Sequence, residues 1–251
     1  MTDKIQVRGL DLFYGTFQGL KQITVSFPAR QITALIGPSG CGKSTLLRCL
    51  NRMNDLVAGV KITGTVMLDD ADIYAPGTDV ESLRRRVGMV FQRPNPFPLS
   101  VFDNVAYGPR LHGERNPVTL RAIVNDSLQA VGLLGVEGVG LGQPALSLSG
   151  EQQQRLCIAR ALATAPDVLL MDEPCSALDP IATAGIEALM QTLVARYTIV
   201  IVTHNMAQAM RASHRTGFML LGELVEIGAT ERIFASASDE RTRDYLAGTF
   251  G

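Results

Sequence analysis

The stretch GPSGCGKS at residues 37–44 decides the fold of this 251-residue chain. It follows the mostly apolar run 31–36 and precedes a segment in which Leu46, Leu47 and Leu50 have helical spacing. The stretch matches G-x-x-x-x-G-K-[ST], a pattern in which backbone N–H groups surround the phosphates of a nucleotide. The helix that follows adds the positive end of its dipole. Strand, loop and helix together predict a phosphate-binding loop in an α/β fold.

Two side chains of this phosphate loop (residues 37–44) have expected roles. Lys43 is expected to reach the β- and γ-phosphates, and the Ser44 hydroxyl to bind Mg²⁺. The alternative is a glycine-rich turn with an incidental lysine. The chain has only four lysines, Lys4, Lys21, Lys43 and Lys61, so a chance match is rare. The motif therefore predicts nucleotide binding.

The composition is that of a globular protein, with 46% hydrophobic and 19% charged residues, which excludes the disordered and fibrous classes. The 23 basic and 24 acidic residues leave a net charge of −1, so no basic excess indicates nucleic-acid binding. The apolar runs are far shorter than the ~20 residues of a membrane-spanning helix, and no signal-peptide core is expected. Four cysteines without CxxC spacing predict neither a zinc site nor a disulfide framework, and so favour a reduced, cytoplasmic setting.

Further strands and helices alternate along the chain. The runs 168–171 and 197–202 are typical of buried parallel strands, and apolar residues between 186 and 193 keep helical spacing. This alternation predicts an α/β fold with a mainly parallel sheet. From about Phe97 to Ala163 strand signals are missing, and an amphipathic helix is expected after Pro117, closed by Gly132. We expect one domain over residues 1–251 with a helical subdomain at 98–160 inserted in it.

Two carboxylates, Asp172 and Glu173, follow the strand 168–171. Metals and ligands collect at the carboxyl ends of parallel strands, so we expect Asp172 in the Mg²⁺ shell and Glu173 polarising a water. Alone, such a pair is more often a turn or a helix cap. Beside a phosphate loop it indicates hydrolysis or transfer of a phosphoryl group. The chain has no N-K-x-D string, as a GTPase would, whereas composition leaves a small-molecule kinase open.

The string LSGEQ at residues 148–152 resembles the signature motif of ABC-type ATPases. Other elements also occur in that family's order. Tyr14 resembles the aromatic that stacks on adenine, and Gln92 resembles the Q-loop glutamine. Residues 176–179 resemble the D-loop, and His204 resembles the switch histidine. Each alone also has a plain structural interpretation, such as a packing aromatic or, at the signature, a helix capping box. Their joint order over essentially the whole chain makes the resemblance specific.

This resemblance implies a P-loop NTPase of ABC type: a mainly parallel sheet core, an N-terminal antiparallel β region and an inserted helical subdomain. It also implies a head-to-tail dimer of two copies, in which the signature of one chain faces the ATP on the phosphate loop of the other. It assigns ATP contacts to Tyr14, Gly37, Pro38, Ser39, Gly40, Cys41, Gly42, Lys43, Ser44, Thr45, Ser149, Gly150, Gln152 and Asp179, catalytic roles to Lys43, Gln92, Glu173 and His204, and Mg²⁺ to Ser44, Gln92 and Asp172.

Longer strings resemble one branch of the family, the ATP-binding subunits of phosphate importers. They lie at 91–98, 103–108, 152–160, 198–206 and 244–251. The resemblance implies ATP-driven phosphate uptake at the cytoplasmic face of the membrane, with two permease subunits, an extracytoplasmic phosphate-binding protein as an indirect partner, and no nucleic acid. A soluble ABC-type ATPase acting on DNA or ribosomes and a small-molecule kinase are the rival hypotheses.

Two positions depart from the family pattern: Glu151 stands where a second glycine is usual, and Cys175 where threonine is common. A carboxylate near a γ-phosphate would repel it, so we expect the Glu151 side chain to point away from the nucleotide. We also expect a lowered thiol pKa for Cys41, because it lies beside a helix N-terminus.

Overall fold

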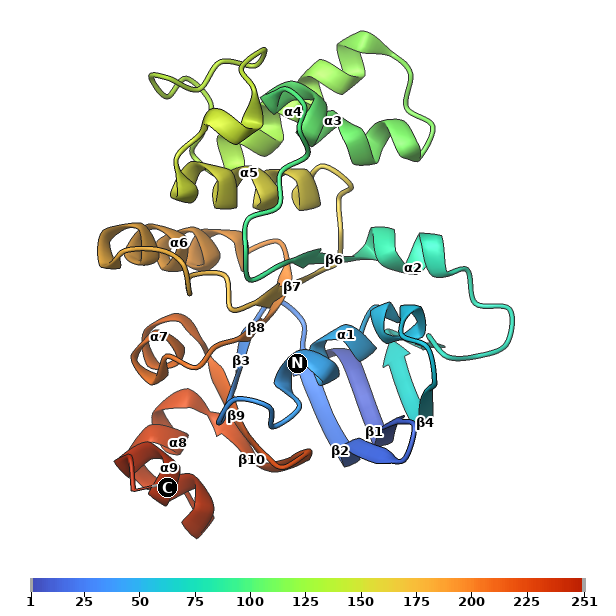
Figure 1. Cartoon of the computed structure of the whole chain (residues 1–251), viewed down its shortest axis with the longest axis vertical. Helices are drawn as coiled ribbons and strands as arrows, with labels where there is room; N and C mark the ends of the chain where they lie inside the picture. Colours follow the sequence, from blue (N-terminus) through green and yellow to red (C-terminus); the bar gives the residue numbers. More distant parts are fainter. Residues whose placement is uncertain (1, 250–251) are drawn as a thin grey trace.

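Two β-sheets form the centre of the fold, and a group of helices lies to one side of them (Figure 1). The structure, a computed structural model, describes residues 2–249. The larger sheet has six strands in the order β10-β9-β3-β8-β7-β6. Its strands are β3 (Ile32–Ile36), β6 (Val87–Val90), β7 (Val168–Asp172), β8 (Thr198–Val202), β9 (Arg215–Leu220) and β10 (Glu223–Ala229). All neighbours pair in parallel except β9 and β10, as the alternating sequence pattern predicts.

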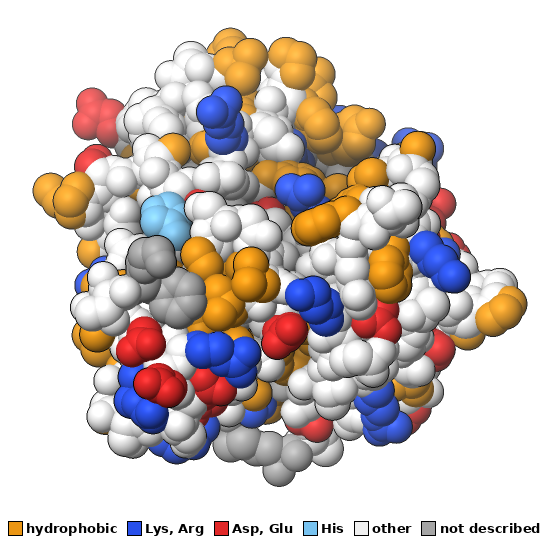
Figure 2. Space-filling view, turned by 60° about the horizontal axis from the view of Figure 1, so that its bottom comes forward, with side chains coloured by type: hydrophobic (Ala, Val, Ile, Leu, Met, Phe, Trp, Pro, Cys, Tyr) orange, Lys and Arg blue, Asp and Glu red, His pale blue; other side chains and the backbone are white. Residues whose placement is uncertain are grey.

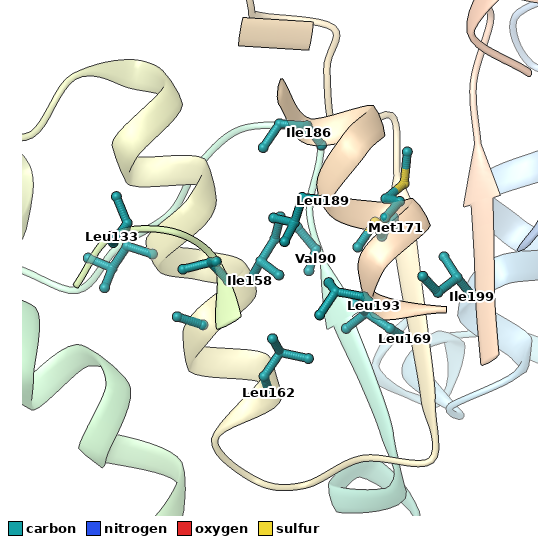
Figure 3. Close-up of a cluster of buried hydrophobic side chains, with 14 of the residues drawn as sticks. Val90, Leu133, Ile158, Leu162, Leu169, Met171, Ile186, Leu189, Leu193 and Ile199 are labelled. Carbon is teal, nitrogen blue, oxygen red and sulfur yellow. The ribbon is translucent and has the colours of Figure 1, made fainter. Parts of the chain in front are cut away.

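The central strands are buried on both faces, which explains their continuous apolar sequences. Successive side chains of a strand point to opposite faces. In β7, Leu169 and Met171 accordingly join one core cluster, whereas Val168 and Leu170 join the other. Figure 3 shows Val90 between the helix that carries Ile158 and the one that carries Ile186, with Leu169 and Met171 beside the latter helix.

The smaller sheet is antiparallel, with the order β2-β1-β4-β5. Its strands are β1 (Asp3–Tyr14), β2 (Phe17–Pro28), β4 (Val60–Leu68) and β5 (Ala71–Asp72). Helix α1 (Lys43–Cys49) contributes Leu46 and Leu47 to the core that both sheets share. The expected N-terminal antiparallel region is thus confirmed.

The separate helical group contains α3 (Val101–Leu111), α4 (Pro117–Ala130) and α5 (Gly150–Leu162) (Figure 1). Asn116 caps α4, Pro117 occupies its first turn, and Gly132 follows with a positive φ, as the sequence indicates. Helix α5 continues two residues beyond the expected boundary at 160. The subdomain division at 98–160 stays a prediction.

The remaining helices flank the larger sheet or its ends. They are α2 (Val80–Arg86), α6 (Pro180–Leu193), α7 (Met206–Ala212), α8 (Thr230–Ser236) and α9 (Glu240–Ala247), with short 3₁₀ turns at Met53–Leu56 and Ala145–Ser147. Within residues 2–249, no helix has both the length and the apolar character needed to cross a membrane. Acidic and basic side chains are interspersed over the face in Figure 2.

Candidate nucleotide-binding and catalytic site

The phosphate loop connects β3 to α1 in a backbone conformation that needs glycine. Gly37 has a φ of 147°, and a Cβ there would lie 2.1 Å from the Met219 carbonyl oxygen. Gly42 has a φ of 103° and forms the N-cap of α1. The turn between β9 and β10 supports the loop, because the Gly222 N–H donates to the Cys41 carbonyl over 3.0 Å. The glycines therefore permit a tight cradle that side chains would obstruct.

Lys43 lies inside this cradle. Its Nζ donates to the carbonyl oxygens of Gly37 and Pro38, both at 2.8 Å, and the residue is only 6% exposed. The ammonium group is thus held where the motif predicts phosphate oxygens. Phosphate oxygens can replace these two carbonyls as acceptors with little movement of the lysine.

Ser44 and Asp172 meet although 128 residues separate them. The Ser44 hydroxyl donates to Asp172 Oδ1 over 2.7 Å. Asp172 ends β7, beside Val202 of β8, and Leu35 of β3 pairs with the same Val202. The parallel register therefore aligns the end of β7 with the start of the phosphate loop.

The oxygens of Ser44 and Asp172 fit Mg²⁺. Hydroxyl and carboxylate oxygens are hard ligands, and Mg²⁺ typically binds through one or two carboxylates plus substrate phosphates and water. Within residues 2–249, no group of three or more His, Cys, Asp and Glu residues could hold a metal alone. A Mg²⁺ ion here would need the nucleotide to complete its shell.

Arg48 is a site residue that the sequence reasoning missed. Its Nη2 lies 3.5 Å from Asp172 Oδ2, while Ser44 occupies the other carboxylate oxygen. Arg48 follows Ser44 by four residues on α1, so the helical spacing places both on one face and was the available signal. The contact holds the carboxylate of Asp172 from both sides.

Glu173 is the point at which three predicted catalytic residues meet. Gln92 Nε2 donates to Glu173 Oε2 over 2.9 Å, and His204 Nδ1 lies 3.0 Å from the same oxygen. Gln92 follows β6 by two residues, Glu173 follows β7 directly and His204 follows β8 by two residues. The adjacent ends of three parallel strands thus bring the three side chains onto one oxygen.

The backbone at Glu173 is in the left-handed region, with a φ of 46°. Such a conformation costs ~1–3 kcal/mol for a residue other than glycine and is common at functional sites. A hydrogen bond from the Glu173 N–H to the Val202 carbonyl, 2.9 Å long, holds it. The strained turn directs the carboxylate toward Gln92 and His204, where it can accept a proton from water.

Tyr14 lies next to the start of α1. Its hydroxyl is 3.2 Å from the Thr45 Oγ1, and its ring covers Gly19, where an added Cβ would approach a ring carbon to 3.1 Å. This position places an aromatic ring beside Thr45, the residue that directly follows the phosphate loop. A nucleotide base could stack there while its phosphates enter the loop.

The signature segment (residues 148–152) belongs to the helical group rather than to the sheet edge. The predicted capping box is present: the Gln152 N–H donates to Ser149 Oγ over 3.3 Å, and the Ser149 N–H donates to Gln152 Oε1 over 3.0 Å. A Cβ added to Gly150 would have nothing within 4 Å. The start of α5 is therefore a capped helix terminus with open space beside Gly150.

The Glu151 side chain turns back along α5. Its Oε1 accepts from Arg155 Nε over 2.8 Å, and Arg155 also donates to the Val131 carbonyl. The carboxylate lies against α6, since a Cβ on Gly185 would approach it to 3.2 Å. The side chain points away from the open side of the helix start, as expected.

Asp179 caps α6, because its Oδ1 accepts from the N–H groups of Ile181 and Ala182 at 2.9 Å. Within one chain, Asp179, Ser149, Gly150 and Gln152 thus lie on other elements than the phosphate loop. Their assignment to ATP stays a prediction that requires a second chain.

The expectation for Cys41 is wrong. Burial raises the pKa of its thiol and outweighs the opposing effect of Lys43. The residue is 2% exposed, with its sulfur beneath Gly37. The sequence places Cys41 near a helix N-terminus, but only the fold shows that its side chain faces inward.

A model of the ABC transporter family matches residues 20–176. Two curated proteins from strains of Streptococcus pneumoniae, both called phosphate import ATP-binding protein PstB 3, are 59% identical over 245 residues, covering 98% of this chain and 98% of theirs. The similarity therefore extends over nearly the full length of the chain.

Solved structures also resemble this chain. CbiO1 from Clostridium perfringens, part of the ABC transporter complex cbiONQ, has a TM-score of 0.83 at 27% identity, covering 98% of this chain and 96% of its own. The dimeric ATP-binding cassette MJ0796, in a post-hydrolysis state with ADP and phosphate, has a TM-score of 0.76 at 27% identity, covering 90% and 98%.

Proposed function

This chain belongs to the ABC transporter family, and we propose from this premise that it is the ATP-hydrolysing subunit of an importer of inorganic phosphate. The observation that supports hydrolysis most directly is the shared oxygen of Glu173, which contacts both Gln92 and His204 beside the Ser44–Asp172 pair. Such a site suits a reaction in which water attacks a phosphoryl group.

In the proposed reaction, Lys43 and the loop N–H groups hold the β- and γ-phosphates, and Tyr14 stacks on adenine. A Mg²⁺ ion held by Ser44 and Asp172 would neutralise charge that develops on the phosphates. Glu173 accepts the proton of the attacking water, while Gln92 and His204 hold its carboxylate in place. His204 does so when its Nδ1 carries the proton, since it then donates to Glu173.

We propose that two copies of the chain act together, head to tail. Ser149, Gly150 and Gln152 of one copy would face the γ-phosphate bound by the other, because a helix N-terminus attracts anions. The open space beside Gly150 and the pairing of the Glu151 carboxylate with Arg155 support this arrangement. The capping box uses the N–H groups of Ser149 and Gln152 and not those of Gly150 and Glu151, which precede any intrahelical acceptor.

The partners follow from the relatives named for phosphate import. We propose that the dimer binds two permease subunits at the cytoplasmic face of the membrane and works with an extracytoplasmic phosphate-binding protein. The segment 94–98 is a suitable permease contact, because Phe97 is held between Tyr107, at 4.6 Å between ring centroids, and the Arg160 guanidinium, at 4.4 Å. Proline and these ring contacts make the segment stiff.

The test is phosphate uptake in cells that express this chain with its permease subunits. We expect deletion of the chain to abolish uptake of radiolabelled phosphate at low external concentration, and re-expression of the unaltered chain to restore it. A Glu173→Gln chain should not restore it. If deletion leaves phosphate uptake normal and impairs uptake of another solute, the substrate assignment is wrong, whereas the assignment as an ATPase survives.

A further inference from the structure

A forked ion pair joins α6 to α7 behind the catalytic residues. Arg211 Nε donates to Glu187 Oε2 over 2.9 Å, and Arg211 Nη2 donates to Glu187 Oε1 over 2.8 Å. Glu187 is 7% exposed, so its carboxylate depends on this partner. A second bond, from Gln191 Nε2 to the Ala212 carbonyl over 2.9 Å, joins the same two helices.

Both helices begin at residues of the proposed reaction. Helix α6 starts at its cap Asp179, at the end of the D-loop segment 176–179, and α7 starts at its cap Asn205, directly after His204. Since α7 has only seven residues, a displacement at Arg211 is transmitted to its first turn. The ion pair therefore links the backbone next to His204 to the backbone next to the D-loop.

One cavity of about 280 Å³ brings these parts together. Its lining includes Glu173, His204 and Arg211, and also Cys175 and the buried Gln208. Arg211, the exposed member of the ion pair, thus lines the same cavity as the hydrolytic carboxylate, whereas Glu187 does not. Glu173 and His204 contact each other and not the ion pair.

We propose that Glu187 and Arg211 are positioning residues: their forked pair holds α7 so that His204 stays on the Glu173 carboxylate. The proposal rests on the proposed function, because it assigns the pair a role in ATP hydrolysis. Loss of the pair should misplace His204 and slow the chemical step, while the phosphate loop and Tyr14, on other elements, continue to bind ATP.

The test compares Arg211→Ala and Arg211→Lys with the unaltered chain in steady-state ATP hydrolysis. We expect Arg211→Ala to lower kcat ~10–100-fold, the scale of a displaced catalytic group, with KM changed less than about twofold. Lysine supplies the positive charge but only a single point of contact. The kcat of Arg211→Lys should therefore lie between that of Arg211→Ala and that of the unaltered chain. A doubly neutral variant, Glu187→Gln with Arg211→Gln, leaves no unpaired charge and should lose kcat while remaining folded.

A matched control is Arg232→Ala, which breaks a contact of 3.4 Å with Glu226 between α8 and β10. The Glu226 and Glu187 side chains are similarly buried, at 9% and 10% exposure, but Arg232, unlike Arg211, does not line the cavity that contains Glu173. The control should keep kcat within about twofold. An equal loss of kcat in the control and in Arg211→Ala, or a normal kcat in a folded Arg211→Ala, would overturn the proposal.

A second measurement needs no hydrolysis. Cys175 is 8% exposed and lines the same cavity, so its rate of modification by a maleimide reports how firmly α7 is held. Peptide mass mapping should show modification several-fold faster in Arg211→Ala than in the unaltered chain and unchanged in Arg232→Ala. If the unaltered chain hydrolyses no ATP, the proposed function fails, and the Cys175 rate alone decides whether the pair holds α7. An unchanged rate overturns that structural role.

Discussion

The phosphate loop and the signature segment are both helix N-termini with an attraction for anions, but they differ in what surrounds them. Around the phosphate loop, Ser44 reaches Asp172, and the next residue, Glu173, receives Gln92 and His204. At the signature segment, Ser149 and Gln152 bond to each other, and Glu151 bonds to Arg155 within the same helix.

This difference shows which part of the site one chain can supply. The sheet edge collects acid, amide, imidazole and ammonium groups because several parallel strands end there. At the start of α5, the capping box uses the N–H groups of Ser149 and Gln152 but not those of Gly150 and Glu151, and the space beside Gly150 is open. One region is therefore a nearly assembled reaction site, and the other is a docking face for a phosphate held elsewhere.

The strongest way to break this comparison is to disable each region in a different copy of the chain. We expect Lys43→Ala to remove ATP hydrolysis through the phosphate loop, and Gly150→Asp to remove it through the signature. An aspartate fits sterically at Gly150, but its charge near a γ-phosphate costs ~4 kcal/mol at 4 Å and an effective dielectric of 20. A mixture of the two variants should hydrolyse ATP although neither does alone, because a mixed dimer contains one intact site.

The control for the added charge is Gly142→Asp, at a glycine that also has open space and lies outside the signature. It should hydrolyse ATP at the normal rate. If the mixture of Lys43→Ala and Gly150→Asp chains stays inactive while each binds its partner, the two regions do not combine across chains.

The second prediction concerns the assembled region alone. Glu173→Gln keeps the size of the side chain but removes the proton acceptor, so kcat should fall ~10²–10⁴-fold. ATP binding should remain, because Lys43, Ser44 and Tyr14 are unchanged. Gel filtration with ATP should then show a stable dimer. A chain that stays monomeric at every ATP concentration would contradict the shared site.

The smallest effect is expected at Glu151, in the docking region. Its carboxylate already pairs with Arg155, so Glu151→Gly should change kcat less than tenfold, a barrier change below ~1.4 kcal/mol. Thermal unfolding should show a loss of stability of ~1 kcal/mol from glycine in the first turn, and Glu151→Gln, which keeps a helix-forming side chain, should lose less. A variant a hundredfold faster would show that the carboxylate inhibits the site.

Much of both regions could be predicted from the sequence, because their parts are local motifs. The glycine pattern of residues 37–44 predicts the phosphate loop. The capping box that the sequence predicts at Ser149 and Gln152 is present in the structure. The strands at 32–36, 168–172 and 198–202 follow from short β-branched and apolar runs. The burial of Cys41 was missed, since part of what covers the loop, Met219 of β9 and Gly222 after it, lies about 180 residues further along the chain.

The sequence by itself determined which chemical groups this protein carries and the order of the elements that hold them: a lysine in a glycine loop, carboxylates after a strand, and a serine at a helix start. Only the tertiary structure decided that Gln92 and His204 share one oxygen of Glu173. It also decided that Arg48 contacts Asp172 and that Arg211 forms a two-bond ion pair with Glu187. The reason is physical. Short motifs encode backbone shape and chemical type, whereas these contacts depend on the register of parallel strands and on helix packing between residues far apart in the chain.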